Sequence, residues 1–225
     1  TPTGLNVIEQ TLAGNLTVFY LGVTLLGLCA AGLLAGYLMQ REMLNARIEQ
    51  TKAIVDMARN MALGLQKQVA AGQMTKEAAI AEFSKRGNTL TFDKGNGYVF
   101  AYTMDGVAVL APVPSQIGQN RMDIDTGGRK LGRELRDGVA ANGEIMLRYE
   151  FRKPGQDELI RKFSYAVPIP GWNMFVGTGA YLDDLDTKMR PIAVVLGLAI
   201  LGIALVAGSI AWMIGRSIAK PLGEL

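Results

Sequence analysis

The sequence contains no histidine, and Cys29 is the single cysteine among its 225 residues. Without histidine, the chain lacks the commonest general base, the commonest metal ligand and the residue that titrates near neutral pH. Zinc sites of the usual kinds and an intrachain disulfide are therefore excluded. Catalysis of the Ser-His-Asp and Cys-His kinds is excluded as well, so we do not expect an enzyme. We expect Cys29 to be a small buried apolar residue.

Clustered charge is also missing from the sequence. The 23 lysines and arginines and 20 aspartates and glutamates give a net charge of +3, and no basic stripe alternates with aromatic residues. A nucleic-acid partner is therefore not expected. The Gly-Thr-Gly segment at 177–179 lacks the third glycine of a dinucleotide loop, and the aspartates within 183–186 lack EF-hand spacing. We expect no cofactor and no metal, and interpret these segments as close strand packing and a solvated turn.

Two long uncharged apolar runs, Leu16–Met39 and Ile192–Ile214, dominate the sequence. Each exceeds the roughly 20 residues that a helix needs to cross a bilayer. We predict transmembrane helices over 16–39 and 191–214, in contact with membrane lipid. The first run is too long for the core of a signal peptide and lacks a convincing cleavage site, so we interpret it as a retained anchor.

Basic residues indicate the orientation of these two spans. Arg216 and Lys220 follow the second run closely, which favours the cytoplasmic side. With two spans, the segments 1–15 and 215–225 are both expected in the cytoplasm, and 40–190 is expected to form one domain outside. Because there is no initiator methionine, we expect the chain to be a fragment.

A regular apolar stripe follows the first span. No proline occurs in Gln40–Gln73. Apolar or small residues recur there at alternating steps of four and three and form a stripe: Leu44, Ile48, Thr51, Val55, Ala58, Ala62, Leu65 and Val69. Ile54, Met57 and Met61 widen this stripe. This 3.5-residue repeat is typical of packed helices. We predict one long helix that continues the span and packs on its own domain. The stripe is compatible both with a second copy in a homodimer and with a purely intramolecular core.

The rest of the central segment alternates helix and strand patterns. A helix is predicted over 75–85, with Thr75 as its N-cap, and another over 130–141. Strand patterns occupy 98–104, 107–111, 144–152, 159–167 and 173–181. A turn is expected at 168–171, and 182–190 is compatible with a helix. The predicted fold is α+β, with a long N-terminal helix packed on a mostly antiparallel sheet of five to six strands and flanked by the two spans.

Three segments resemble known receptor modules. GYVFAYTMDGVAVLAP at 97–112 and IRKFSYAVPIPGWNMFVGTGAYLDDLD at 160–186 are similar to the first and last hairpins of single Cache sensor domains of the second subtype. RSIAKPLGEL at 216–225 resembles the opening of a HAMP linker. The combination is typical of bacterial methyl-accepting chemotaxis proteins. The resemblance implies a PAS-like periplasmic sensor over 40–190, a two-pass inner-membrane protein, a homodimer, and cytoplasmic signalling partners that bind beyond residue 225.

Aromatic and basic residues in the predicted strands are the candidate site. Tyr98, Phe100 and Tyr102 share one strand face and form either core or a pocket wall with hydroxyl groups. Lys162 lies in an apolar strand, where it reaches solvent or faces an anion. The resemblance favours the anion, since the matching lysine of the family contacts carboxylate ligands.

Further candidates complete the predicted site. Tyr165 is expected to help enclose the ligand, and Tyr149 and Arg129 to add hydrogen-bond donors. Ala111 occupies the position where family members commonly carry a histidine, which removes one ligand contact. Candidates to compensate lie in the following loop and are Gln116, Asn120 and Arg121.

The resulting expectation is a chemoreceptor fragment that senses a small organic acid, most simply a short-chain carboxylate, and relays binding through the second span to HAMP. One alternative places the same sensor on a histidine kinase or a diguanylate cyclase. A second alternative is a membrane-anchored structural domain that senses nothing, which a fully filled sheet face would favour.

Overall fold

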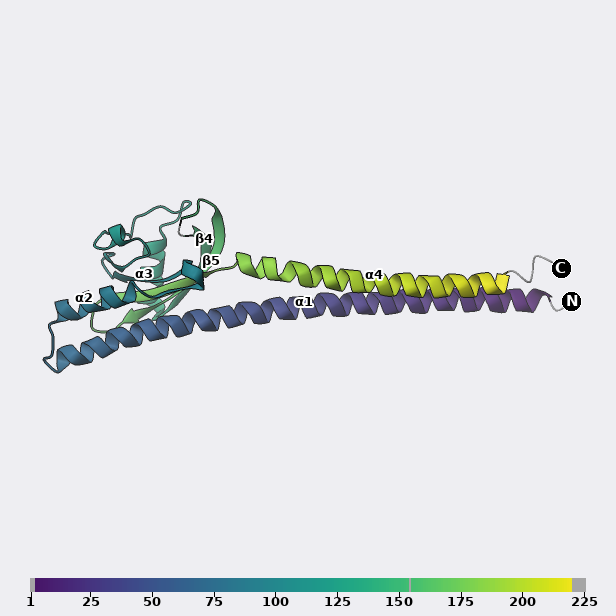
Figure 1. Ribbon diagram of the computed structural model, residues 1–225, viewed down its shortest axis with the longest axis horizontal. Helices are drawn as coiled ribbons and strands as arrows, with labels where there is room; N and C mark the ends of the chain where they lie inside the picture. The colour runs from purple at the N-terminus through teal and green to yellow at the C-terminus, as the bar shows by residue number, and fades with distance from the viewer. Residues whose placement is uncertain (1–2, 154, 220–225) are drawn as a thin grey trace. The chain divides into compact units, whose positions relative to one another are not determined.

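The computed structural model describes residues 3–153 and 155–219 (Figure 1). The described chain divides into two compact units. Leu44–Asp184 forms one unit, and the helical segments before Leu44 and after Asp184 form the other. In the unit formed by the helical segments before Leu44 and after Asp184, Gly32 lies against Leu196. A Cβ on Gly32 would lie 2.8 Å from Leu196 Cδ2, so a small residue permits this close approach between apolar helices.

The first helix, α1 (Thr3–Ala70), is continuous over 68 residues. This confirms the long helix predicted from the apolar repeat. Residues of the repeat are buried against the sheet: Thr51, Val55, Ala58, Ala62 and Leu65. Ile54 and Met61 pack at the edge of that core, whereas Met57 is 64% exposed, so the stripe is narrower than expected.

A six-stranded antiparallel sheet forms the centre of Leu44–Asp184, with the order β1-β2-β6-β5-β4 and β3 paired to β2. Its strands are β1 (Thr91–Phe92), β2 (Gly97–Thr103), β3 (Ala108–Leu110), β4 (Ile145–Arg152), β5 (Leu159–Ile169) and β6 (Met174–Tyr181). The predicted α+β class and antiparallel sheet are confirmed. The two-residue strand β1 was not predicted, because two residues show no period.

Strand β5 extends further than expected. It runs to Ile169, so Pro168 lies in the strand and not in a turn. The last pair between β4 and β5 is Ile145 with Ala166. Beyond that pair one side of β5 is open, and proline is tolerated where a strand has a free edge.

The two faces of the sheet carry different partners. On one face, α1 and α2 (Lys76–Gly87) cover a core that includes Phe83, Val99 and Val176. On the other face, α3 (Leu131–Asn142) packs through Leu135 and Val139 on Phe100 and Phe175. Figure 1 shows α2 and the C-terminal part of α1 on one side of the sheet and α3 on the other. Alternate residues of β2, β5 and β6 therefore point into two separate interiors.

The helix boundaries near the domain are well defined. Thr75 caps α2 as predicted, and its Oγ1 accepts a hydrogen bond of 3.2 Å from Ala78 N. Helix α3 ends at Asn142 and is capped by Gly143, whose φ of 75° places it in the left-handed region that glycine adopts readily. Two 3₁₀ turns, η1 (Asp93–Gly95) and η2 (Pro114–Gln116), occupy the loops beside β2 and β3.

The last helix, α4 (Asp183–Ala219), is separated from β6 by the single residue Leu182 and contains Pro191. Two described helical segments are long and apolar enough to cross a membrane, Phe19–Ala70 and Arg190–Ile210, whose 18-residue apolar windows have mean hydropathies of 2.0 and 2.6. Cys29 is partly accessible, so the expectation that it is buried is wrong. Most of the segment that resembles a HAMP linker lies at 220–225, outside the described residues.

Candidate ligand-binding site

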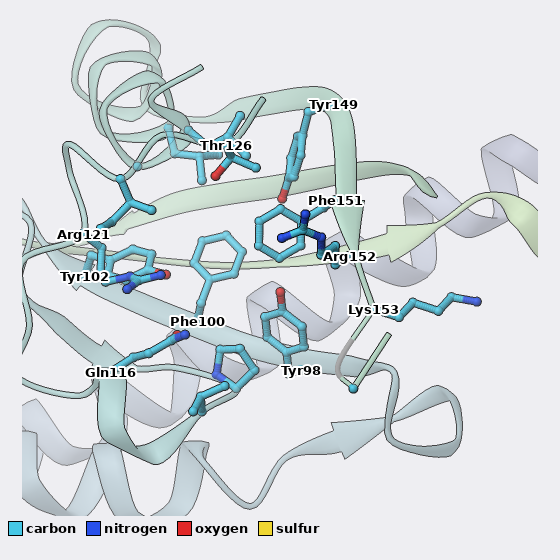
Figure 2. A pocket seen from close by; sticks show the side chains of 17 residues that line it. Tyr98, Phe100, Tyr102, Gln116, Arg121, Thr126, Tyr149, Phe151, Arg152 and Lys153 are labelled. Carbon is cyan, nitrogen blue, oxygen red and sulfur yellow. The ribbon is translucent and has the colours of Figure 1, made fainter. Parts of the chain in front are cut away.

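A cavity of about 280 Å³ lies on the sheet face opposite α1 (Figure 2). Strands β2 and β4, the segment at 112–126, and the start of α3 form its wall. Among the described lining residues there is no aspartate or glutamate, while arginine, lysine and glutamine are present. Its wall is therefore apolar and aromatic with positively charged groups, a composition suited to an organic anion.

Strand β2 supplies one aromatic wall of the cavity. Tyr98, Phe100 and Tyr102 all line it, as expected from their shared strand face. Glycines on the neighbouring β6 make room for them and for the side chains of β5. A Cβ on Gly177 would lie 2.6 Å from Phe100 Cζ, and a Cβ on Gly179 would lie 2.4 Å from Ser164 Oγ. The Gly-Thr-Gly segment thus fits close packing.

Lys162 is 1% exposed and projects toward the same end of the cavity as Tyr98. Its Nζ donates a hydrogen bond of 2.9 Å to Tyr98 Oη and lies 3.5 Å from Tyr181 Oη. The ammonium is enclosed by the rings of Tyr98, Tyr181 and Phe151, with Nζ 4.3, 4.6 and 5.1 Å from their centroids. Within residues 3–153 and 155–219 it forms no ion pair. Burial lowers the pKa of Lys162 from 10.5 to about 7.

Lys162 does not itself line the 280 Å³ cavity. Its side chain contributes to the wall of a neighbouring hollow, together with Tyr149 and Arg129. Its ammonium is linked to the 280 Å³ cavity by the hydrogen bond to Tyr98, which lines that cavity.

Three tyrosine hydroxyls cluster near Lys162, and two of these tyrosines, Tyr98 and Tyr149, line the cavity. Tyr149 Oη lies 2.7 Å from Ser164 Oγ, and Figure 2 shows the hydroxyls of Tyr98 and Tyr149 pointing toward one another. Tyr181 Oη donates a hydrogen bond of 2.6 Å to Arg152 O. Burial raises the pKa values of Tyr98 and Tyr149, and that of Tyr181 to about 12. These phenols are neutral near pH 7 and offer hydrogen bonds without adding negative charge.

Tyr165 does not belong to this site, contrary to expectation. It lies three residues from Lys162 on β5, so the two side chains point to opposite faces. Tyr165 packs in the core covered by α1, and its Oη donates a hydrogen bond of 2.6 Å to Glu144 Oε2. The prediction that Tyr165 encloses the ligand is wrong.

Arg129 is not placed on the main cavity either. Its Nη2 pairs with Glu134 Oε2, its Nε donates to Glu134 Oε1 at 3.0 Å, and its Nη1 donates to Arg148 O at 2.9 Å. It lines the neighbouring hollow with about two fifths of its side chain exposed. Since its donors are engaged within the protein, Arg129 is a weak ligand contact.

Loop residues contribute groups that periodicity does not reveal. Of the three candidates named in this loop, Arg121 and Gln116 line the cavity, whereas Asn120 is structural, since its Nδ2 donates to Asp105 O at 2.8 Å. Ala111 borders a separate cavity of about 80 Å³ that also touches Tyr98. Tyr181 was not predicted, although its even spacing from Gly177 and Gly179 on β6 signals the same face.

The sequence profile of the single Cache domain 2 family matches residues 43–194. The chain belongs to this family. The match includes all six strands and both cavities described above. Membership confirms the resemblance noted in the two hairpins.

Individual relatives agree with the family. The chain is 25% identical over 199 residues to the methyl-accepting chemotaxis protein McpP of Pseudomonas putida, covering 88% of this chain and 36% of McpP. It is 34% identical over 111 residues to the sensor histidine kinase MctS of Rhizobium johnstonii, covering 48% of this chain and 24% of MctS. The chain therefore spans about a third or less of these relatives.

Solved structures show the same fold. A structure described as the structural basis for carboxylic acid recognition by a Cache chemosensory domain matches with a TM-score of 0.59 and 28% identity, over 63% of this chain and 97% of that chain. A methyl-accepting chemotaxis protein from Vibrio parahaemolyticus matches with a TM-score of 0.55 and 27% identity, over 67% of this chain and 99% of the other.

Proposed function

We propose that Leu44–Asp184 is the periplasmic sensor of a two-pass bacterial receptor and that it binds a small organic carboxylate. The observation that carries this proposal is Lys162, a buried ammonium without an ion-pair partner in the described chain. Burying a charge without a counter-ion is costly, and an anionic ligand offsets that cost. The similar Cache domain whose structure concerns carboxylic acid recognition supports the same ligand class.

The carboxylate is recognised by hydroxyls that the ammonium polarises. The ligand accepts hydrogen bonds from Tyr98 and Tyr149, and Lys162 lies directly behind Tyr98. A hydrogen bond to a charged group contributes about 1.5–3 kcal/mol. Because micromolar affinity requires about 8 kcal/mol, enclosure by the aromatic wall supplies much of the remainder. The hydroxyl-rich cavity argues against a purely structural domain, which would fill this sheet face with core side chains.

Ligand binding is relayed along β6 into α4. Tyr181, which contacts Lys162, donates to Arg152 O, and the adjacent Lys153 Nζ lies 2.6 Å from Asp183 Oδ2 at the start of α4. A ligand that binds one arrangement of these groups better shifts the equilibrium toward it. The displacement then enters the second span without a flexible linker.

The complete receptor is proposed to be a homodimer of the inner membrane, with 1–15 and 215–225 in the cytoplasm, spans over 16–39 and 191–214, and the sensor over 40–190. Residues 215–225 would open a HAMP linker that carries the signal to cytoplasmic partners. McpP favours a chemotaxis output without enzymatic activity in this segment. MctS favours a second candidate, the same sensor on a histidine kinase.

Calorimetry on the detergent-solubilised chain tests the proposed ligand class. A panel of carboxylic acids with two to four carbons is titrated into wild type and into Lys162→Met, which keeps an apolar stem and removes the charge. We expect binding of at least one acid, weakened tenfold or more in Lys162→Met. Lys52→Met is the matched control, because Lys52 lies by Tyr165 on the opposite face. Equal affinity in wild type and Lys162→Met would refute the role of the ammonium.

A further inference from the structure

The cavity carries a second positive group that the contacts within the protein leave unused. Arg121 lines its wall, and its guanidinium forms no hydrogen bond or ion pair with any described residue. The other two cations of the wall each have a partner within the protein. Arg152 Nε donates to Asp157 O at 3.0 Å, and Lys153 Nζ pairs with Asp183. Arg121 is thus the one lining cation of the described chain with none of its five N–H donors engaged.

Arg121 lies on the Tyr102 side of the cavity, whereas Tyr98, which contacts Lys162, lies across Phe100 from Tyr102. Figure 2 shows the Arg121 guanidinium beside Tyr102, with Gln116 nearby. Tyr98 and Tyr102 are four residues apart on β2, which separates their Cα atoms by about 13 Å. Burial raises the pKa of Tyr102, and the positive charge of Arg121 offsets part of that rise. The guanidinium is therefore close enough to the Tyr102 hydroxyl to act on it electrostatically.

The backbone of Arg121 is fixed, so this placement is built into the fold. Its N–H donates a hydrogen bond of 2.9 Å to Gly106 O. A Cβ on Gly132 would lie 2.6 Å from Arg121 O, so the start of α3 packs directly against this residue. Between the two positively charged ends the wall is apolar, with Phe100 and Leu135.

We propose that the ligand of this cavity carries two anionic ends and is a short-chain dicarboxylate. One carboxylate binds Tyr98 and Tyr149 in front of Lys162. The other is held by Arg121, whose planar fork matches a carboxylate in two parallel hydrogen bonds, with the amide of Gln116 beside it. The methylene groups lie along Phe100. This inference rests on the proposed function and narrows its ligand class, because a monocarboxylate would leave Arg121 without a partner.

Matched pairs of acids test the second anionic end. Succinate and butyrate have the same number of carbons and differ in whether the far end carries a carboxylate or a methyl group. Glutarate with valerate, and adipate with hexanoate, extend the series. In calorimetry on the solubilised chain, we expect one dicarboxylate to bind at least tenfold more tightly than its monocarboxylate partner.

Variants of Arg121 decide whether that preference arises where we place it. Arg121→Gln is expected to weaken the preferred dicarboxylate tenfold or more and to change its monocarboxylate partner less than twofold. Arg121→Lys keeps the charge and should restore part of the loss, and thermal unfolding verifies that both variants fold. Arg136→Gln, on α3 with its guanidinium paired to Asp137, is the control and should change neither.

Four results would overturn the inference. Equal binding of both members of every pair contradicts it, as does a loss in Arg121→Gln that is the same for both members. If monocarboxylates bind and depend on Lys162 while dicarboxylates do not bind, the two-ended ligand is wrong and the proposed carboxylate sensor survives. If no acid binds at all, both proposals fail.

Discussion

At the scale of single residues, the proposed recognition of a carboxylate depends on Lys162. Its ammonium is surrounded by three aromatic rings and two hydroxyls, which stabilise a cation only in part. Desolvation therefore dominates and brings the pKa of Lys162 down to about 7. Because this pKa is close to neutral pH, a neighbouring negative charge is enough to shift Lys162 to its protonated form.

This pKa predicts how the stability of the ligand-free protein depends on pH. The unfolded chain keeps the lysine protonated up to about pH 10.5, whereas the folded protein releases the proton near pH 7. Between these values the unfolded state holds more protons, so stability rises with pH, and below pH 7 it is flat with respect to this group. We expect the thermal midpoint of wild type to rise from pH 7 to 9 relative to that of Lys162→Met.

The measurement stops at pH 9 because of the tyrosines. Burial raises the pKa values of Tyr98 and Tyr149, so near pH 10 these groups make stability fall with pH and oppose the rise due to Lys162. Parallel pH profiles for the two proteins would contradict the depressed pKa.

Sequence reasoning located part of the site and missed the rest for identifiable reasons. Tyr98, Phe100 and Tyr102 follow directly from the period of two in a strand. Tyr165 lies outside the site because it is an odd number of positions from Lys162 along β5, which puts the two side chains on opposite faces. Arg121 was a candidate only by its place in the loop, since a loop has no period, and the packing of that loop against α3 brings it to the cavity.

At the scale of secondary-structure elements, β6 shapes the cavity by what it leaves out. A Cβ on Gly179 would lie 2.4 Å from Ser164 Oγ and 2.6 Å from Lys162 Cε. We expect Gly179→Ala to displace these side chains, to destabilise the protein by about 1–3 kcal/mol, and to weaken ligand binding. Chemical denaturation and calorimetry measure the two effects. Gly64→Ala is the control, since nothing lies within 4 Å of that helical position and alanine favours the helix by about 0.5–1 kcal/mol. Unchanged binding in Gly179→Ala would show that the glycine does not position Lys162.

The contact between the residue that follows β4 and the start of α4 is expected to transmit binding. Lys153 Nζ pairs with Asp183 and lies 5.4 Å from the centroid of the Tyr181 ring. We predict that Lys153→Gln keeps ligand affinity within about twofold, because its charge is already neutralised by Asp183. The same change should abolish the ligand-induced change in amide exchange over the first turns of α4. If Lys153→Gln leaves that exchange response intact, the signal takes another route.

Elements with a strong period were predictable, and short or context-dependent ones were not. The 3.5-residue repeat indicated the long helix α1, and the alternation in β4 matches its observed half-buried pattern. The extension of β5 through Pro168 was not predictable, because it depends on where β4 stops pairing. Local sequence disfavours proline in a strand, and the open edge created by the tertiary structure permits it.

At the scale of the whole molecule, the proposed topology places the sensor outside the membrane. Cysteine labelling tests it, since a Cys29→Ser background has no other cysteine. Ser115 lies on η2 and is exposed. We expect Ser115→Cys to react with a membrane-impermeant thiol reagent in intact spheroplasts. Labelling of Ser115→Cys only after lysis would invert the topology.

The central claim is that the sensor buries an ammonium group whose counter-ion is the ligand. Proton uptake on binding measures this directly, by calorimetry of the bound carboxylate in buffers with different ionisation enthalpies at pH 8. Because Lys162 is largely neutral there without ligand and charged with it, we expect uptake of about one proton per ligand in wild type and none in Lys162→Met. Binding to wild type without proton uptake would contradict the account.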